Sequence, residues 1–382
     1  MTPYRIARAV VGAAVGIILI AALYGGLERL GWRLPPVDAG TSSVHGALMI
    51  AGFFGAVIGV ERAVALTTGA RSRRTRLAFA APLLCVFGAL LLVSDPGNAL
   101  GRLALTGGSL ALVCVYAVVI WRQPTLFTIT MGLGAYALLI GNARWSSGQP
   151  IDAIVYWWIA FLVLTIVGER LELARMIRPT RGRTAAFVAA TALYLGGVAL
   201  TSLELDLGVR VAGAGMLALA IWLARYDIAR RTVRQRGLTR YIAICLLAGY
   251  VWLGIGGGLA LVYASQGAAY SYNAILHSVL LGFVFSMIFG HAPIIIPAVA
   301  RLAVPYHPRF YAHLALLHAS LLLRISGDLL ASPAARRWGG LGNEIALIVF
   351  LLLTAASIAS GQRVQRQRTS HTPASIQPSA SH

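Results

Sequence analysis

The sequence predicts an all-α membrane protein, a polytopic bundle of about twelve transmembrane helices. Hydrophobic residues make up 58% of the 382 residues and charged residues only 12%, whereas soluble domains carry roughly twice that charged fraction. Apolar runs of about twenty residues recur along the whole chain, and a bilayer core of about 30 Å requires that length. These observations exclude an ordinary soluble domain.

Twelve apolar segments are expected to span the bilayer, and the first lacks the cleavage site of a secretory signal. They lie near residues 7–27, 44–66, 77–94, 100–121, 125–142, 151–169, 184–202, 208–225, 238–264, 272–298, 309–330 and 340–360. The connecting loops are too short for a soluble domain. We therefore expect one transmembrane domain, residues 1–362, and a disordered cytoplasmic tail, residues 363–382, which is polar and rich in Ser, Pro and Gln.

The basic residues are all arginines, and the formal net charge is +20. They occupy short loops between apolar runs, so we expect a lipid bilayer as partner and no nucleic acid. One set of loops, together with the tail, carries 22 arginines, and the opposite set carries seven. By the positive-inside rule both termini are cytoplasmic, and the expected location is a bacterial-type inner membrane. The three cysteines are isolated in apolar segments and predict no disulfide.

Three of the segments carry ionisable residues at a similar depth. The second ends in Glu61-Arg62, the sixth ends in Glu169-Arg170, and the tenth reaches His291. Because these are the second segments of three successive groups of four, they suggest three pseudo-repeated four-helix blocks. The arginines could simply mark a helix boundary, but two carboxylates and an imidazole at matched depth are more typical of a site.

Five of the eight histidines lie within apolar segments, where an imidazole needs a hydrogen-bond partner or a metal. His45 and His277 lie near the outer ends of two segments that run in the same direction, so they are expected at one depth, where a pair of imidazoles can hold a heme from both faces. Small and aromatic residues would let a flat macrocycle approach: Gly46, Ala47, Met49, Gly52 and Phe53 after His45, and Ser278, Gly282 and Phe283 after His277. A structural hydrogen bond explains either histidine alone equally well, but for the pair we favour ligation.

A second cluster is expected in the cytoplasmic half of the bundle. His291 follows His277 by about 21 Å of helix, so the two cannot share a metal. The residues predicted near His291 are Glu61, Glu169, Glu172 and His313, with His318 closer to the middle of the membrane. Carboxylates with imidazole suit non-heme iron, zinc or manganese better than copper, so a second metal is one hypothesis. A metal-free proton relay is the alternative, and for His318 a hydrogen bond to a neighbouring helix.

The segments around His45 and His277 resemble subunit I of the heme-copper oxidase superfamily, and more closely its NnrS-type relatives. The resemblance covers the twelve-segment layout, the threefold block pattern, the run from His45 through Met49 and Gly52 to Phe53, and His277 with Gly282, Met287 and Gly290. It implies that His45 and His277 ligate a low-spin heme b. It also implies that Arg336 and Arg337 contact the heme propionates, for which a pair of cations is physically suited.

The sequence departs from the oxidases at the copper site, because the sixth and seventh segments contain no histidine. A proton-pumping oxidase is therefore not expected. The NnrS-type relatives are linked to nitric oxide tolerance. The resemblance thus implies a heme-bearing membrane redox protein of nitric oxide or oxygen chemistry. As an enzyme it would be an oxidoreductase acting on such a diatomic, with a quinol or another redox partner.

Two other classes of function stay open. The first is a cofactor-free, ion- or proton-coupled transporter, in which Glu61, Glu169 and Asp328 act as relays and Arg324 as counter-ion. The second is a non-catalytic heme sensor or assembly protein. The colour of the purified protein separates a heme protein from a cofactor-free transporter.

Overall fold

The computed structural model describes residues 3–35, 40–67, 73–174, 180–264 and 269–370, and within these ranges the chain is helical, with no strand. Eleven helices of the described chain are long and apolar enough to cross a membrane. The prediction of an all-α, multi-pass membrane protein is therefore confirmed.

The N-terminal half contains a composite helix that carries His45 at one end and Glu61 at the other. The helices of this half are α1 (Pro3–Arg29), α4 (Ala80–Ser94), α5 (Ala99–Arg122), α6 (Leu126–Ser146) and α7 (Ile151–Ala174). The composite helix follows α1 and consists of a 3-10 turn η1 (Thr41–Val44), α2 (His45–Ala47), a π-helical segment η2 (Leu48–Phe54) and α3 (Gly55–Thr67). The 3-10 helix η3 (Arg73–Phe79) precedes α4.

The C-terminal half repeats this composite design around His277. Its first helices are α8 (Arg181–Leu200), α9 (Leu205–Tyr226), the short α10 (Ala229–Thr232) and α11 (Gly237–Tyr263). The composite helix consists of α12 (Ala269–His277), a π-helical segment η4 (Ser278–Phe285) and α13 (Ser286–Ala300). The chain ends with α14 (Phe310–Leu329) and α15 (Pro333–Ser370). The polar residues of α14 lower its hydropathy, and it is not among the eleven apolar helices.

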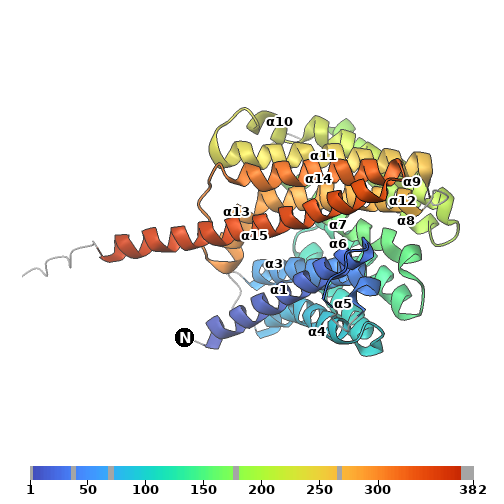
Figure 1. Ribbon diagram of the computed structural model, residues 1–382. Helices are drawn as coiled ribbons and strands as arrows, with labels where there is room; N and C mark the ends of the chain where they lie inside the picture. Colours follow the sequence, from blue (N-terminus) through green and yellow to red (C-terminus); the bar gives the residue numbers. More distant parts are fainter. Residues whose placement is uncertain (1–2, 36–39, 68–72, 175–179, 265–268, 371–382) are drawn as a thin grey trace, which may run out of the picture.

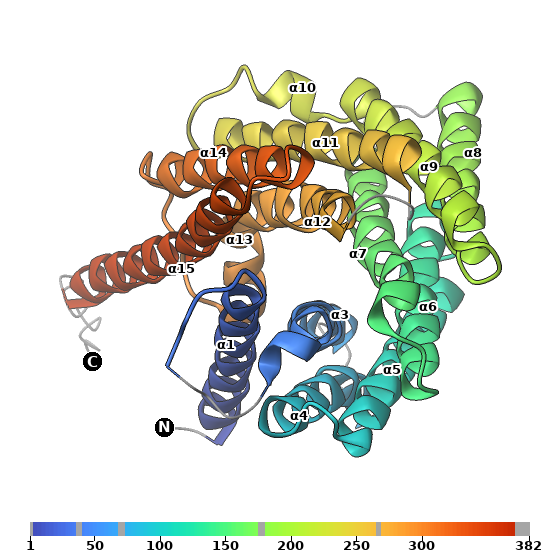
Figure 2. The same cartoon turned by 45° about the vertical axis from the view of Figure 1, so that its right-hand side comes forward.

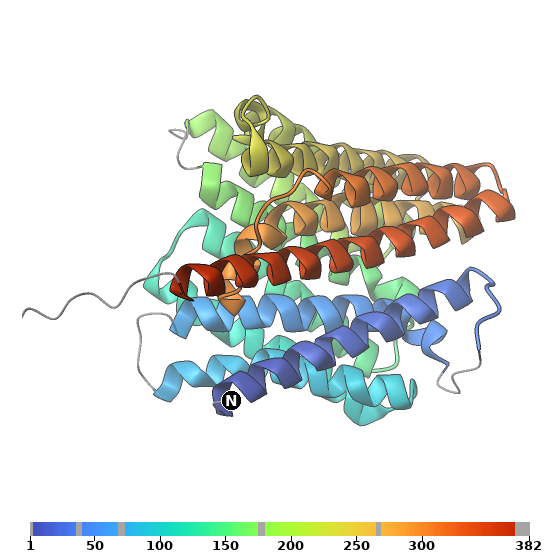
Figure 3. The same ribbon diagram turned by 60° about the vertical axis from the view of Figure 1, so that its left-hand side comes forward.

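The long helices lie side by side in one bundle (Figures 1 and 3). Figure 2 shows α1, α3, α4 and α5 on one side of the bundle and α8, α9, α11 and α14 on the other, with α7 between them. The start of α1 and the far end of α15 lie at the same end of the bundle (Figures 1 and 3). We call this the Glu61 end and the opposite one the His45 end.

Helix α7 lies at the centre and is the most buried of the apolar helices, with 78% of its most apolar window inside the protein. It is apolar on every side from Ile154 to Leu164, as expected of a helix surrounded by other helices. Trp158 fixes it to α6, because its indole N–H donates to Asn142 Oδ1 at 2.9 Å. This central position brings Glu169 and Arg170, at the far end of α7, between the two composite helices.

The last helix differs from the prediction at both ends. It begins at Pro333, a residue favoured in the first turn of a helix, so Arg336 and Arg337 lie in that turn rather than in a loop. It continues to Ser370, eight residues into the segment expected to be disordered. The Gln and Arg residues after Gly361 have good helix propensity, which accounts for the extension. Residues 371–382 of the expected tail lie outside the described ranges.

Candidate functional site

A cavity at the His45 end contains both histidines that were predicted to act together. Its walls come from α1, the composite helix of His45, α7, the composite helix of His277, α14 and α15. The apolar part of the lining includes Leu23, Met49, Phe54, Ile151, Leu281 and Phe285. The polar part consists of Arg29, Ser43, His45, Tyr272, Asn273, His277, Arg324, Arg336, Asn343 and Glu344. An apolar pocket with a few convergent polar groups is the usual form of a cofactor site.

The two imidazoles are held in the same way. His45 Nδ1 is 2.6 Å from the carbonyl oxygen of Ala22, and His277 Nδ1 is 2.8 Å from that of Asn273. A carbonyl oxygen can only accept, so Nδ1 carries the proton in each ring and Nε2 carries the lone pair. Metal-bound histidines almost always have such a partner on their other nitrogen. Both rings are therefore in the tautomer that ligation through Nε2 requires.

A π-helical segment follows each of these histidines directly. Helix η2 begins three residues after His45, and η4 begins immediately after His277. A π-turn widens the helix by one residue and changes which side chains face a neighbour, and such turns are frequent at functional sites. The two composite helices are therefore similar in backbone geometry as well as in the position of their histidines.

The glycines of these segments serve packing between helices. A Cβ at Gly52 would come within 2.8 Å of the Ala89 Cβ, and one at Gly282 within 2.3 Å of the Trp252 Cγ. Neither glycine lines the cavity, whereas Gly46 and Met49 do. Gly46 therefore lies at the cavity wall, whereas Gly52 and Gly282 serve packing between helices.

Three arginines and a glutamate give the cavity its charge. Arg324 donates from Nη2 to His277 Nε2 at 2.9 Å, and it lies within electrostatic range of Asp328 and Glu344. Arg336 lines the cavity and pairs with Asp328, Nε to Oδ1, at 3.1 Å. The predicted arginine pair is split, because Arg337 lies over the Trp32 ring, 4.4 Å from its centroid, and is not in the lining.

A second polar group lies at the Glu61 end, between α3 and α7. Arg62 Nη2 donates to Glu61 Oε1 at 2.9 Å, and the same nitrogen donates to Glu169 Oε1. From the sequence this arginine could simply mark a helix boundary, but its side chain turns to the two carboxylates. The reason is electrostatic, since a partly buried carboxylate pair is costly without a cation.

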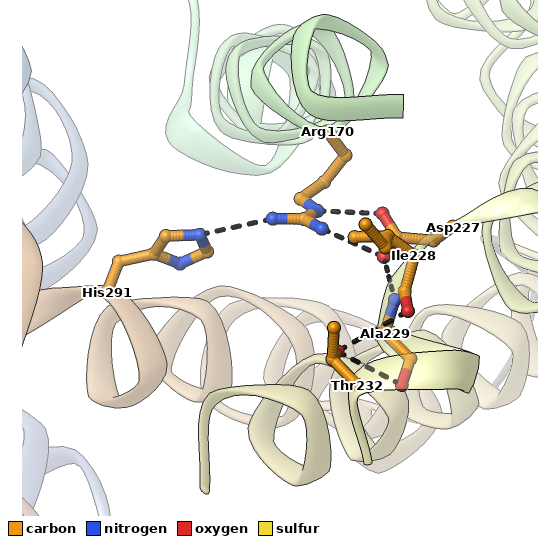
Figure 4. A network of polar contacts seen from close by, with 6 residues as sticks. All are labelled: Arg170, Asp227, Ile228, Ala229, Thr232 and His291. Carbon is orange, nitrogen blue, oxygen red and sulfur yellow. Dashed lines mark hydrogen bonds and ion pairs between the residues drawn. The ribbon is translucent and has the colours of Figure 1, made fainter. Parts of the chain in front are cut away.

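Arg170, which follows Glu169 in the sequence, forms a buried ion pair (Figure 4). Its Nε and Nη2 donate to the two oxygens of Asp227 at 2.8 Å each, and both side chains are at most 3% exposed. Asp227 Oδ1 also accepts from the backbone N–H of Ala229 at 2.7 Å, at the start of α10. On the other side, Arg170 Nη1 lies 3.5 Å from His291 Nε2, whose ring donates from Nδ1 to the Met287 carbonyl at 2.7 Å.

The structure thus brings Glu61, Glu169 and His291 to one end of the bundle, with arginines between them. Glu172 and His291 both lie within electrostatic range of Glu61. In the described ranges no three side chains of His, Cys, Asp or Glu are gathered to hold a metal ion. The second metal stays a prediction from the sequence.

His313 and His318 have partners elsewhere. The Tyr241 hydroxyl and His313 Nε2 are hydrogen-bonded at 2.9 Å, in a cage of Phe289, Phe310 and Phe350. The Trp252 indole donates to His318 Nδ1 at 2.9 Å, which is the hydrogen bond to a neighbouring helix that the sequence left as the alternative.

Sequence reasoning missed several residues of these sites. Arg29, Asn343 and Glu344 of the cavity lie near helix ends or in apolar runs, and no motif marks them. Asp227 follows α9 directly and was passed over as a loop residue, although a lone aspartate between two apolar segments was a usable signal. The π-helical segments leave no recognisable trace in the sequence.

Fold and site together define a multi-pass α-helical membrane protein with a histidine-bearing cavity at one end and an arginine–carboxylate network at the other. A family model described as a domain of unknown function (DUF8744) matches residues 8–359, and the chain belongs to that family. No curated protein and no solved structure matches the chain.

Proposed function

We propose that the protein binds a b-type heme through His45 and His277 and acts as a membrane redox protein. One observation carries the proposal: both imidazoles line one cavity, and each donates from Nδ1 to a backbone carbonyl, so that Nε2 of each is free of a proton. Iron porphyrins accept imidazole nitrogen on either face, and the heme would supply one-electron redox chemistry.

The polarity and charge of the remaining lining support this assignment. The apolar walls would keep water from the macrocycle, and Arg324 and Arg336 would balance the charge of two propionates. Arg324 occupies His277 Nε2, so ligation there requires this hydrogen bond to break. Asp328 and Glu344, both within electrostatic range of Arg324, offer it other partners.

The wider part of the proposal follows from the resemblance to NnrS-type relatives of heme-copper oxidase subunit I. It includes three four-helix blocks, both termini at the cytoplasmic face of a bacterial-type inner membrane, and a quinol or other redox partner. The substrate class is nitric oxide or another diatomic gas, which crosses lipid without an aqueous channel. The equivalent design of the two composite helices supports the repeat.

The test is the visible spectrum of purified protein with single histidine substitutions. His45→Ala and His277→Ala should each lose or strongly alter the heme bands, because each removes one nitrogen that would hold the iron. His307→Ala is the matched control, since His307 is exposed in a loop. All three proteins must elute as the wild type does in size-exclusion chromatography. Unchanged bands in both cavity variants would contradict the assignment.

A cofactor-free transporter is the second candidate, and the Arg324–His277 hydrogen bond favours it. In that case Arg324 has a hydrogen bond to His277 and the charge of Glu344 within electrostatic range, and the group needs no iron. The same purification separates the two candidates, because a transporter of this kind is colourless and stays colourless after incubation with heme.

A further inference from the structure

The Glu61 end of the bundle holds an arrangement that the heme proposal does not use. Glu61 and Glu169 come from different helices, yet one nitrogen, Arg62 Nη2, donates to both. Two oxygens that accept from the same nitrogen cannot be farther apart than the sum of the two hydrogen-bond lengths. The carboxylates are therefore close neighbours that share a single cation.

The charges around this pair can be followed element by element. On α7, Arg170 forms a bidentate ion pair with Asp227. The aspartate largely balances the charge of Arg170. On α13, His291 donates from Nδ1 to a carbonyl and faces Arg170 with Nε2, which fits a neutral ring. Glu172, three residues after Glu169, adds a further carboxylate within range of Glu61 and has an interaction of its own. Among the described residues, Arg62 thus faces two carboxylates.

Two buried polar atoms beside the pair have no partner in the described chain. The Tyr116 hydroxyl of α5 is one, and its residue is 1% exposed. It lies within electrostatic range of Arg62, Glu169 and Glu61. The second is Arg62 Nε. Unpaired buried donors at one place usually mark a bound water or a small polar ligand.

We propose that Glu61 and Glu169 form a proton-binding site, in which the pair holds one exchangeable proton over Arg62, with water between the pair and Tyr116. Two carboxylates that cannot separate hold one proton between them, because like charges at short distance in a poorly hydrated site destabilise each other. One proton brings the two carboxylates and Arg62 to zero net charge. It enters from water, since the side chains of Glu61 and Glu169 are 24% and 23% exposed.

Infrared difference spectroscopy of the full-length protein between alkaline and acidic pH tests this proposal. We expect one carbonyl stretch of a protonated carboxylic acid, which disappears as the pH rises and moves to lower wavenumber in D₂O. Glu61→Gln and Glu169→Gln should each abolish that band, because the remaining carboxylate then pairs with Arg62 alone and stays ionised. Glu204→Gln, at the exposed start of α9, is the matched control and should leave the band unchanged.

Tyr116→Phe provides a second, milder variant. It should keep the band but shift its position, because the water loses one hydrogen-bond partner. Persistence of the band in either glutamine variant would overturn the proposal, as would its absence from the wild type at every pH at which the protein stays folded. Suppression of the band by Na⁺ or Mg²⁺ at constant pH would also overturn it, in favour of a cation site. None of these results depends on bound heme.

Discussion

The buried histidines differ in the partners of their ring nitrogens. His45 and His277 donate from Nδ1 to backbone carbonyls and face a cavity. His313 is hydrogen-bonded through Nε2 to the Tyr241 hydroxyl, and His318 accepts at Nδ1 from Trp252; neither histidine lines the cavity. The nitrogen that accepts is occupied and cannot bind iron unless that bond breaks. His277 Nε2 also accepts, from Arg324, so the ligand candidates differ from the structural histidines by their shared cavity and by their Nδ1–carbonyl hydrogen bonds.

Arg336 and Arg337 should behave differently, although they are adjacent. Arg336→Gln removes a cation from the cavity, so it should lower the heme midpoint potential by on the order of tens of millivolts, because a nearby positive charge favours the reduced state. Arg337→Gln is the control, because Arg337 stacks on Trp32 outside the lining. Redox titration measures both. Equal shifts in the two variants would be incompatible with the described lining.

At this scale the sequence identified the types of residue but not their partners. The predicted grouping of His45 with His277 appears in one cavity, because both lie at corresponding places on helices that run the same way. The side-chain direction of Arg62 was not predictable, since it depends on the position of Glu169, 107 residues away.

Among the helices, the two composite ones determine where the histidines point. Deletion of Ala51 would shorten η2 by one residue and turn His45 by about 100° relative to α3. We expect loss of the heme bands while the protein still inserts, because the Arg62 contacts on the other side of the deletion keep their register. Deletion of Ala13, an exposed residue of α1, is the comparison. A deletion variant of η2 with an intact spectrum would show that the π-turn does not position His45.

The close packing of η4 against α11 leads to a prediction about the stability of glycine variants. Gly282→Ala places a Cβ 2.3 Å from the Trp252 Cγ and should destabilise the protein by about 1–3 kcal/mol. Gly258→Ala, on α11, meets nothing within 4 Å and should be neutral or slightly stabilising. Thermal unfolding in detergent measures the difference. Equal melting temperatures would mean that η4 can move away from α11 at little cost.

The helices themselves followed from the sequence with few errors. The segment predicted at 272–298 corresponds to Tyr270–Ala300, and the one at 44–66 to Thr41–Thr67. Long apolar runs leave little choice in a bilayer, because every backbone group must bond within its own segment. The π-turns depend on tertiary contacts, and the extension of α15 depends on the helix propensity of polar residues outside the apolar run. A hydropathy pattern contains information on neither of these causes.

On the scale of the whole molecule, Arg170 and Asp227 join α7 to the loop between α9 and α10 and to α13. Asp227→Asn leaves Arg170 buried without its counter-charge and should destabilise the protein by about 3–5 kcal/mol. Asp206→Asn is the matched control, because its partner Arg210 is 39% exposed and such pairs contribute about 0–1 kcal/mol. Thermal melts of both variants provide the comparison. A small effect of Asp227→Asn would mean that water reaches Arg170.

The central claim is that one heme is held between His45 and His277 across the two composite helices. Electron paramagnetic resonance of the oxidised wild-type protein, purified in detergent with heme supplied during expression, tests it most directly. Two axial imidazoles give a low-spin ferric signal, and we predict that signal at one heme per chain, with its loss in His45→Ala and in His277→Ala. A protein that binds no heme under these conditions, or whose low-spin signal survives both substitutions, would contradict the claim.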